Sequence, residues 1–211
     1  MGLLLCGGAN ATDGRDDRAM DVLEIGVGDS LSCIARELEL ATHRLIARDP
    51  AGLAELADIV GAAPRVFVLG AGRSGLALRM TAMRLMHLGL AVHVVGEVTA
   101  PAIEPGDLLL AASGSGTTGG IVRAAQTAVD AGARVAAVTT VPDSPLATLA
   151  AVTIVVPAAG KLDRSEAASE QYAGSLFEQL VVVLGDALFH TLWRRSGLTA
   201  DDLWPRHANL E

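Results

Sequence analysis

The segment Asp107-Leu-Leu-Leu-Ala-Ala-Ser-Gly-Ser-Gly-Thr-Thr-Gly-Gly120 joins an apolar run to a loop of glycines and hydroxyl residues. After its first residue, the run from Asp107 to Ala112 is apolar without alternation, which is typical of a strand covered on both faces of a parallel sheet. A stretch of helical length, Gly119–Ala131, follows the loop. The segment therefore predicts a strand, a loop and a helix in succession, which is the repeating unit of α/β folds.

The loop itself, Ser113–Thr118, has the composition of a phosphate cradle. At a helix N-terminus, free backbone N–H groups and the positive end of the helix dipole face any bound anion. Glycines such as Gly114 let the backbone approach closely, and each hydroxyl can donate to a phosphate oxygen. The hydroxyl residues are Ser113, Ser115, Thr117 and Thr118. A serine-rich helix cap is the alternative, although one cap needs only one hydroxyl. A Walker A loop is excluded because the only lysine, Lys161, lies elsewhere.

Similar apolar runs recur on both sides of this segment, separated by helical stretches. They are rich in β-branched residues and bounded by Gly and Pro, as expected for buried strands. The five predicted strands are Arg65–Leu69, Ala91–Val95, Asp107–Ala112, Arg134–Thr139 and Val152–Val156. Their alternation with helices Ser74–Leu88 and Gly119–Ala131 predicts a parallel sheet with right-handed crossovers. We expect an α/β fold with strand order 2-1-3-4-5, flanked by helices as a flavodoxin-like three-layer sandwich.

The two ends of the chain differ in character from its centre. Residues 1–19 are rich in Gly, Asp and Arg without periodicity, which predicts a disordered leader before a single domain at 20–211. Amphipathic helices are predicted at Leu31–Arg48 and Leu53–Val60. A long helix, about Tyr172–Arg195, is apolar nearly all round, which is more than one sheet face requires, so we expect C-terminal oligomerisation helices.

Composition narrows the class of protein. The 211 residues are 51% hydrophobic with a net charge of −8, which fits one α/β domain and argues against binding to nucleic acid or acidic membranes. No uninterrupted apolar run approaches the roughly 18 residues of a membrane span. The isolated Cys6 and Cys33 predict neither a disulfide framework nor a metal site, and they suit a cytoplasmic protein.

A second glycine-rich loop, Gly70-Ala-Gly-Arg-Ser-Gly75, matches G-x-G-x-x-G and follows the first predicted strand. With the acidic Glu97 at the end of strand two, it also fits a dinucleotide site. Two observations favour a monophosphate instead. The Ser113–Thr118 loop provides a second anion cradle, and residues 171–211 are too few and too helical for the second substrate region of a dehydrogenase.

These motifs occur in an order that resembles one family. The most specific are Met83-Arg-Leu-Met-His-Leu-Gly89 and the ending Arg206-His-Ala-Asn-Leu-Glu211. Further matching segments are Gly70–Gly75, Val95–Glu97, Ser113–Gly116, Asp143–Ala147 and Ser175–Gln179. From about Ile34 onward the chain resembles the 6-phospho-3-hexuloisomerase family of SIS (sugar isomerase) domains. In place of Thr117 the family usually has Glu or Lys, and the leader before about Met20 has no counterpart.

The resemblance implies an activity. It implies isomerisation of 3-hexulose 6-phosphate to fructose 6-phosphate through an enediol, without metal or cofactor, in the ribulose monophosphate pathway of formaldehyde fixation. It also implies a homotetramer and 3-hexulose-6-phosphate synthase as a possible pathway partner. Two alternatives stay open: another SIS-type isomerase of aldose, ketose or amino-sugar phosphates, and a sugar-phosphate-sensing module. No helix-turn-helix precedes the domain, which disfavours the sensor.

Moving a carbonyl from C3 to C2 requires a base that removes one proton and returns another. Glu178 is the candidate because it lies in an otherwise apolar segment and matches the family's proposed base; a solvated or salt-bridged glutamate is the alternative. The family match gives His87 a substrate-facing role, as proton shuttle or hydroxyl ligand, although a lone histidine there is usually a core residue or a cap.

The remaining candidate residues are expected to bind substrate. Arg73 and Ser74, with Gly72, begin a helix that faces the ligand crevice, so Arg73 could neutralise an enediolate or bind sugar hydroxyls. Glu97 and Thr99 follow strand two and are candidates for the sugar site. His207 could reach the site of a neighbouring subunit or pack in an interface.

Overall fold

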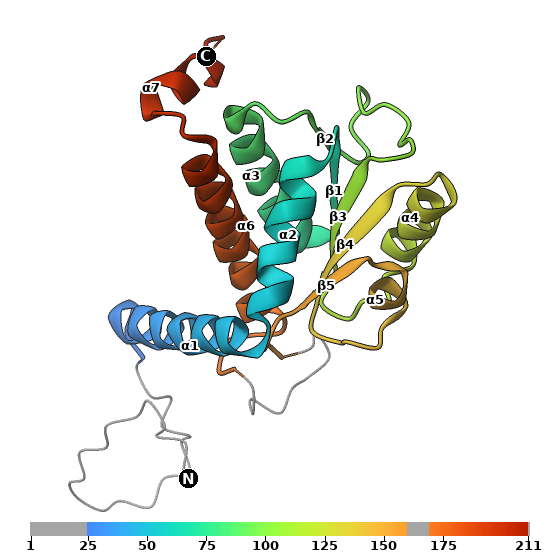
Figure 1. The fold of residues 1–211 in the computed structure, drawn as a ribbon. Helices are drawn as coiled ribbons and strands as arrows, with labels where there is room; N and C mark the ends of the chain where they lie inside the picture. Colours follow the sequence, from blue (N-terminus) through green and yellow to red (C-terminus); the bar gives the residue numbers. More distant parts are fainter. Residues whose placement is uncertain (1–24, 160–168, 211) are drawn as a thin grey trace, which may run out of the picture.

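The computed structural model describes residues 25–159 and 169–210. The predicted leader, residues 1–19, lies outside the described residues, as does most of the predicted loop Ala158–Glu170. The described part forms a five-stranded sheet of order β2-β1-β3-β4-β5, as predicted (Figure 1). The strands are β1 (Val66–Gly70), β2 (Val92–Val94), β3 (Leu108–Ala112), β4 (Arg134–Thr139) and β5 (Val152–Val155).

Every strand pair is parallel. β1 lies between β2 and β3, with Val66 opposite both Val92 and Leu108, and β3 pairs in turn with β4. All five residues of β3 are buried, which explains why its sequence is uniformly apolar. Strand order reverses between β1 and β3, and open α/β sheets bind ligands at the carboxyl edge beside such a reversal.

Helices cover both faces of the sheet (Figure 1). They are α1 (Val27–Arg48), α2 (Pro50–Ala62), α3 (Gly72–Leu88), α4 (Gly119–Asp130), α5 (Pro145–Leu149), α6 (Ser175–Ser196) and α7 (Ala200–Leu203), followed by the 3-10 turn η1 (Trp204–Arg206). Helices α2, α3 and α6 share one core with one side of the sheet, and α4 and α5 share a second core with the other side. The predicted three-layer α/β sandwich is therefore confirmed.

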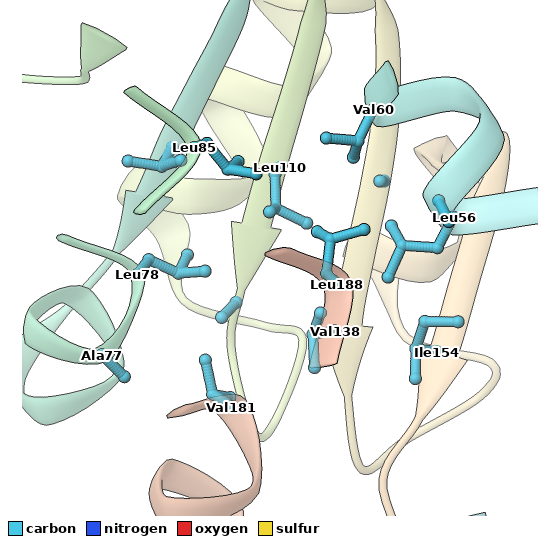
Figure 2. Close-up of a cluster of buried hydrophobic side chains, with 14 of the residues drawn as sticks. Leu56, Val60, Ala77, Leu78, Leu85, Leu110, Val138, Ile154, Val181 and Leu188 are labelled. Atoms are coloured by element: carbon cyan, nitrogen blue, oxygen red, sulfur yellow. The ribbon is translucent and has the colours of Figure 1, made fainter. Parts of the chain in front are cut away.

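The larger core lies where three helices meet the sheet (Figure 2). Its side chains include Leu56 and Val60 of α2, Leu78 and Leu85 of α3, Val181 and Leu188 of α6, and Leu110, Val138 and Ile154 of the strands. Side chains of the helices pack between those of the strands. The burial of this apolar surface is the main contribution to the free energy that holds α3 and α6 to the sheet.

Helix α6 begins at Ser175, three residues after the predicted start at Tyr172. By length and mean hydropathy alone α6 could cross a membrane. Its buried residues, among them Leu180, Val181 and Leu188, pack in the core instead. The apolar character of α6 is therefore explained in part by its packing beside α3 and α2 in this core.

Candidate active site

A pocket of about 380 Å³ opens at the carboxyl edge of the sheet, beside the strand reversal. It is lined by the loop after β1, the loop after β3 and the chain entering α6. The lining residues are Ala71, Gly72, Arg73, Ser74, Ala112, Ser113, Gly114, Ser115, Thr118, Ile121, Ala159, Tyr172, Ala173, Gly174, Ser175, Phe177 and Glu178. Eight predicted site residues therefore lie together: Gly72, Arg73, Ser74, Ser113, Gly114, Ser115, Thr118 and Glu178.

Three helices begin at this pocket, and none of them has a side-chain cap. The N-cap residues of α3, α4 and α6 are Ala71, Thr118 and Gly174, and none makes a side-chain cap hydrogen bond. By contrast, α2, α5 and α7 begin elsewhere and are capped by Asp49, Ser144 and Thr199. Uncapped N-termini leave backbone N–H donors for a ligand, and their combined dipoles favour an anion.

The hydroxyls of the β3–α4 loop are arranged in two pairs. Ser113 is buried, and its Oγ lies 3.0 Å from Oγ1 of Thr118. The Oγ of Ser115 accepts from the backbone N–H of Thr117 at 3.3 Å and from its Oγ1 at 2.9 Å. The hydroxyl hydrogen of Ser115 is therefore free to point toward an anion in the pocket. Thr117 is exposed and lies outside the pocket lining, and its hydroxyl contacts the pocket through this hydrogen bond to Ser115.

Neighbouring loops hold the cradle loop in place. The carbonyl of Gly114 accepts from the hydroxyls of Thr139 and Thr140, at 3.0 and 2.9 Å. Gly116 has a φ of +63°, and a Cβ there would collide with Ser144 at the start of α5. Glycine is required at this position both for its backbone conformation and for this close approach.

Arg73 and Glu178 form an ion pair in the lining of the pocket. Nη1 of Arg73 lies 3.1 Å from Oε2 of Glu178 and donates to Oγ of Ser175, also at 3.1 Å. Glu178 is partly buried in the first turn of α6, with 22% of its side chain exposed. Among the residues that line the pocket it is the only carboxylate.

The first glycine-rich loop is explained by packing. A Cβ on Gly70 would lie 2.9 Å from Cα of Gly75, so the β1–α3 turn closes only with small residues.

Glu97 pairs with Arg79 at 2.8 Å and lines a second cavity of about 370 Å³ between the loop after β2 and α4. Thr99 is exposed on the same loop. The structure therefore does not place Glu97 and Thr99 in the main pocket.

His87 and His207 lie together at the opposite end of α3. Their rings stack with centroids 4.0 Å apart, and His207 also packs on Trp204. Since α3 begins at the pocket and rises about 1.5 Å per residue, His87 lies roughly 22 Å along the helix from Gly72. Burial, then His207 and Arg84, lowers the pKa of His87, and its Nδ1 has no hydrogen-bond partner among the described residues.

The sequence prediction missed the chain that enters α6. Tyr172, Ala173, Gly174 and Ser175 line the pocket, and Ala173 has a φ of +52°, unusual for a residue with a Cβ. Ser175 stands in the segment that carried the family resemblance and could have been found there. The others gave no signal, because their place in the pocket depends on where α6 begins.

The fold and this pocket define a class of doubly wound α/β proteins that bind small anionic ligands between helix N-termini. A family model described as SIS domain matches residues 59–169. The chain is 53% identical over 195 residues to 3-hexulose-6-phosphate isomerase of Mycobacterium gastri, covering 92% of this chain and 96% of that protein. It belongs to the SIS domain family, and within that family to the 3-hexulose-6-phosphate isomerases.

Two further relatives agree with this assignment. The 3-hexulose-6-phosphate isomerase of Bacillus subtilis is 39% identical, with 74% of this chain and 85% of that protein covered. The crystal structure of a hypothetical protein from Methanococcus jannaschii superposes with a TM-score of 0.74 at 29% identity, covering 87% of this chain and 99% of that one. Its authors inferred a function of 3-hexulose-6-phosphate isomerase.

Proposed function

We propose that this protein isomerises 3-hexulose 6-phosphate to fructose 6-phosphate in the pocket between α3, α4 and α6. The observation that carries the proposal is the 53% identity to a 3-hexulose-6-phosphate isomerase over 92% of the chain. We further propose a cytoplasmic homotetramer that acts in the ribulose monophosphate pathway, next to a 3-hexulose-6-phosphate synthase.

The phosphate group binds at the β3–α4 loop in this proposal. Ser113 and Ser115 supply hydroxyl donors, and the N-terminus of α4 supplies backbone N–H groups. This places the sugar chain toward Arg73 and Glu178, which line the same pocket. Binding energy at the phosphate then fixes the position of the reacting carbons.

Glu178 is the base. It removes the proton from C2, and the electrons of that C–H bond form a C2=C3 double bond while negative charge develops on the C3 oxygen. Arg73 and the N-termini of α3 and α6 stabilise this charge. Protonated Glu178 then gives its proton to C3, and the C2 hydroxyl proton passes to the C3 oxygen, which leaves the ketone at C2.

Turnover in deuterium oxide tests the enediol step. An exchangeable proton on Glu178 gives fructose 6-phosphate with deuterium at C3, which NMR detects. If the fructose 6-phosphate carries its deuterium at another carbon and none at C3, proton transfer takes place elsewhere in the sugar. That result would contradict the enediol step.

We propose that His87 and His207 serve the pocket of a neighbouring copy. Within one chain they lie at the far end of α3 from Glu178. His207 is exposed, so a partner subunit can contact it directly. His87 is buried beneath the ring of His207. The face of α3 also carries the exposed apolar residues Leu76, Met80 and Met83, which suit burial against another subunit.

A further inference from the structure

Glu37, near the middle of α1, holds the chain that leads into α6. Its Oε2 accepts from Oγ of Ser169 at 2.8 Å and from Nε2 of Gln171 at 2.8 Å, and its Oε1 accepts from the backbone N–H of Glu170 at 2.7 Å. Hydrogen bonds to a carboxylate are stronger than those between neutral groups, and three of them fix one carboxylate to three successive residues.

A second residue on the same face of α1 reinforces this contact. Cys33 lies one helical turn before Glu37, and its Sγ is 3.5 Å from Oε2 of Glu170. On the other side, Oε1 of Gln171 accepts from Nε2 of Gln179 in α6 at 2.8 Å. The segment Ser169–Gln171 is therefore held between α1 and α6, and Figure 1 shows α1 lying across the start of α6.

This segment continues directly into the pocket wall. Tyr172 to Ser175 line the pocket, and Glu178 follows in the first turn of α6. Within the wall, Ala173 has a φ of +52°, a conformation that persists only where surrounding contacts impose it. The position of Ser175, which accepts from Arg73, therefore depends on where the preceding residues are fixed.

We propose that Glu37 is a positioning residue for the isomerase site, acting through Ser169–Gln171 on Ser175 and Glu178. Its hydrogen bonds among the described residues reach 169–171 and none of the residues that line the pocket. The phosphate cradle lies on the β3–α4 loop, outside this set of hydrogen bonds, so loss of Glu37 impairs proton transfer and spares phosphate binding. The predicted effect on catalysis rests on the proposed function, whereas the ordering of the pocket wall by Glu37 does not.

The test compares Glu37→Gln and Glu37→Ala with Glu39→Gln, a matched control at an exposed position of the same helix. Three quantities are measured: kcat and KM with 3-hexulose 6-phosphate, inhibition by inorganic phosphate, and hydrogen–deuterium exchange of peptides covering 169–175 in substrate-free protein. We expect kcat to fall at least about ten-fold in both Glu37 variants, with KM and phosphate inhibition within about two-fold of wild type. Exchange in 169–175 accelerates, and the control matches wild type.

Equal losses in kcat and phosphate binding would overturn the proposal, because they indicate general damage to the fold. Unchanged exchange in 169–175 would overturn it as well, whatever the kinetics. If wild-type protein turns over no 3-hexulose 6-phosphate, the proposed function fails. The exchange experiment still decides whether Glu37 orders the wall, because it needs no substrate.

Discussion

Glu178 and Arg73 form the ion pair on which the proposed chemistry depends. The carboxylate lies 3.1 Å from the guanidinium, and both side chains face the pocket. A sugar phosphate that enters brings its own anionic oxygens, and Arg73 can exchange its contact with Glu178 for one with the substrate. A sensor of sugar phosphates has no need of a base at this position.

Replacing Glu178 by glutamine keeps the size of the side chain and removes the base. We expect kcat to fall by about 10²–10⁴-fold, which is the usual contribution of general acid–base catalysis. The measurement is turnover of 3-hexulose 6-phosphate, with circular dichroism to verify folding. Glu55→Gln, an exposed glutamate on α2, is the control. Near-normal turnover in folded Glu178→Gln would contradict the assignment of the base.

Thr117→Val removes the hydroxyl that donates to Oγ of Ser115, while Thr117→Ser keeps it. Loss of one such hydrogen bond costs about 1 kcal/mol, so KM for the phosphorylated substrate should rise roughly five-fold in the valine variant with little change in kcat. Steady-state kinetics of both variants provides the comparison. Equal effects of valine and serine would show that the hydroxyl is not what orients Ser115.

Local pattern explains which site residues could be predicted. Ser113–Thr118 and Glu178 are visible in the sequence because a hydroxyl-rich loop after a buried strand and a carboxylate near the start of a largely apolar helix are local features. Glu37 is not visible, because its partner Ser169 lies 132 residues away along the chain. A local pattern also could not show that His87 and Glu97 lie away from the pocket. The position of His87 depends on the direction of α3, and that of Glu97 on the course of the loop after β2.

The contact between α3 and α6 fixes the geometry of the pocket, because Arg73 lies in the first turn of α3 and Glu178 in the first turn of α6. The two helices approach closely at Gly185, where a Cβ would collide with Oγ1 of Thr81 and lie 3.1 Å from its Cβ. Thr81 is itself buried. A small residue at 185 is therefore a condition for this packing.

Gly185→Ala should destabilise the protein by about 1–3 kcal/mol through overpacking. For a chain of this size, each kcal/mol lowers Tm by roughly 2–4 °C. Gly28→Ala is the matched control, because a Cβ at that helical position meets nothing within 4 Å. Alanine there should leave Tm unchanged or raise it slightly. Calorimetry that finds the two variants equally stable would contradict the close packing of α3 on α6.

Strands and long helices were predictable because each is a run of apolar residues or a periodic pattern with Gly or Pro at its ends. The five-residue helix α5 is too short for periodicity to reveal, although Ser144 as N-cap and Pro145 at the first position are recognisable starting signals. The start of α6 was placed too early because Tyr172 and Ala173 continue the composition of the helix, and only the backbone conformation of Ala173 separates them from it.

For the whole molecule, the proposed role of His87 in the pocket of a neighbouring copy predicts that a complete site needs two copies. Hybrids can be made by co-expressing Glu178→Gln and His87→Asn chains with different tags. We expect each parent assembly to be nearly inactive and the purified hybrids to recover activity, because some sites then combine wild-type Glu178 with wild-type His87. Hybrids that assemble and stay as inactive as their parents would contradict a shared site.

The most direct test of the assignment is the specificity of the purified protein. kcat/KM is measured for 3-hexulose 6-phosphate and for a panel of aldose, pentulose and amino-sugar phosphates. Isomerisation at the pocket of this chain predicts fructose 6-phosphate as the product, with a kcat/KM for 3-hexulose 6-phosphate at least about 100-fold above any other, a difference of roughly 3 kcal/mol in transition-state binding. A folded, assembled protein that prefers an aldose or amino-sugar phosphate, or that forms no fructose 6-phosphate, would contradict it.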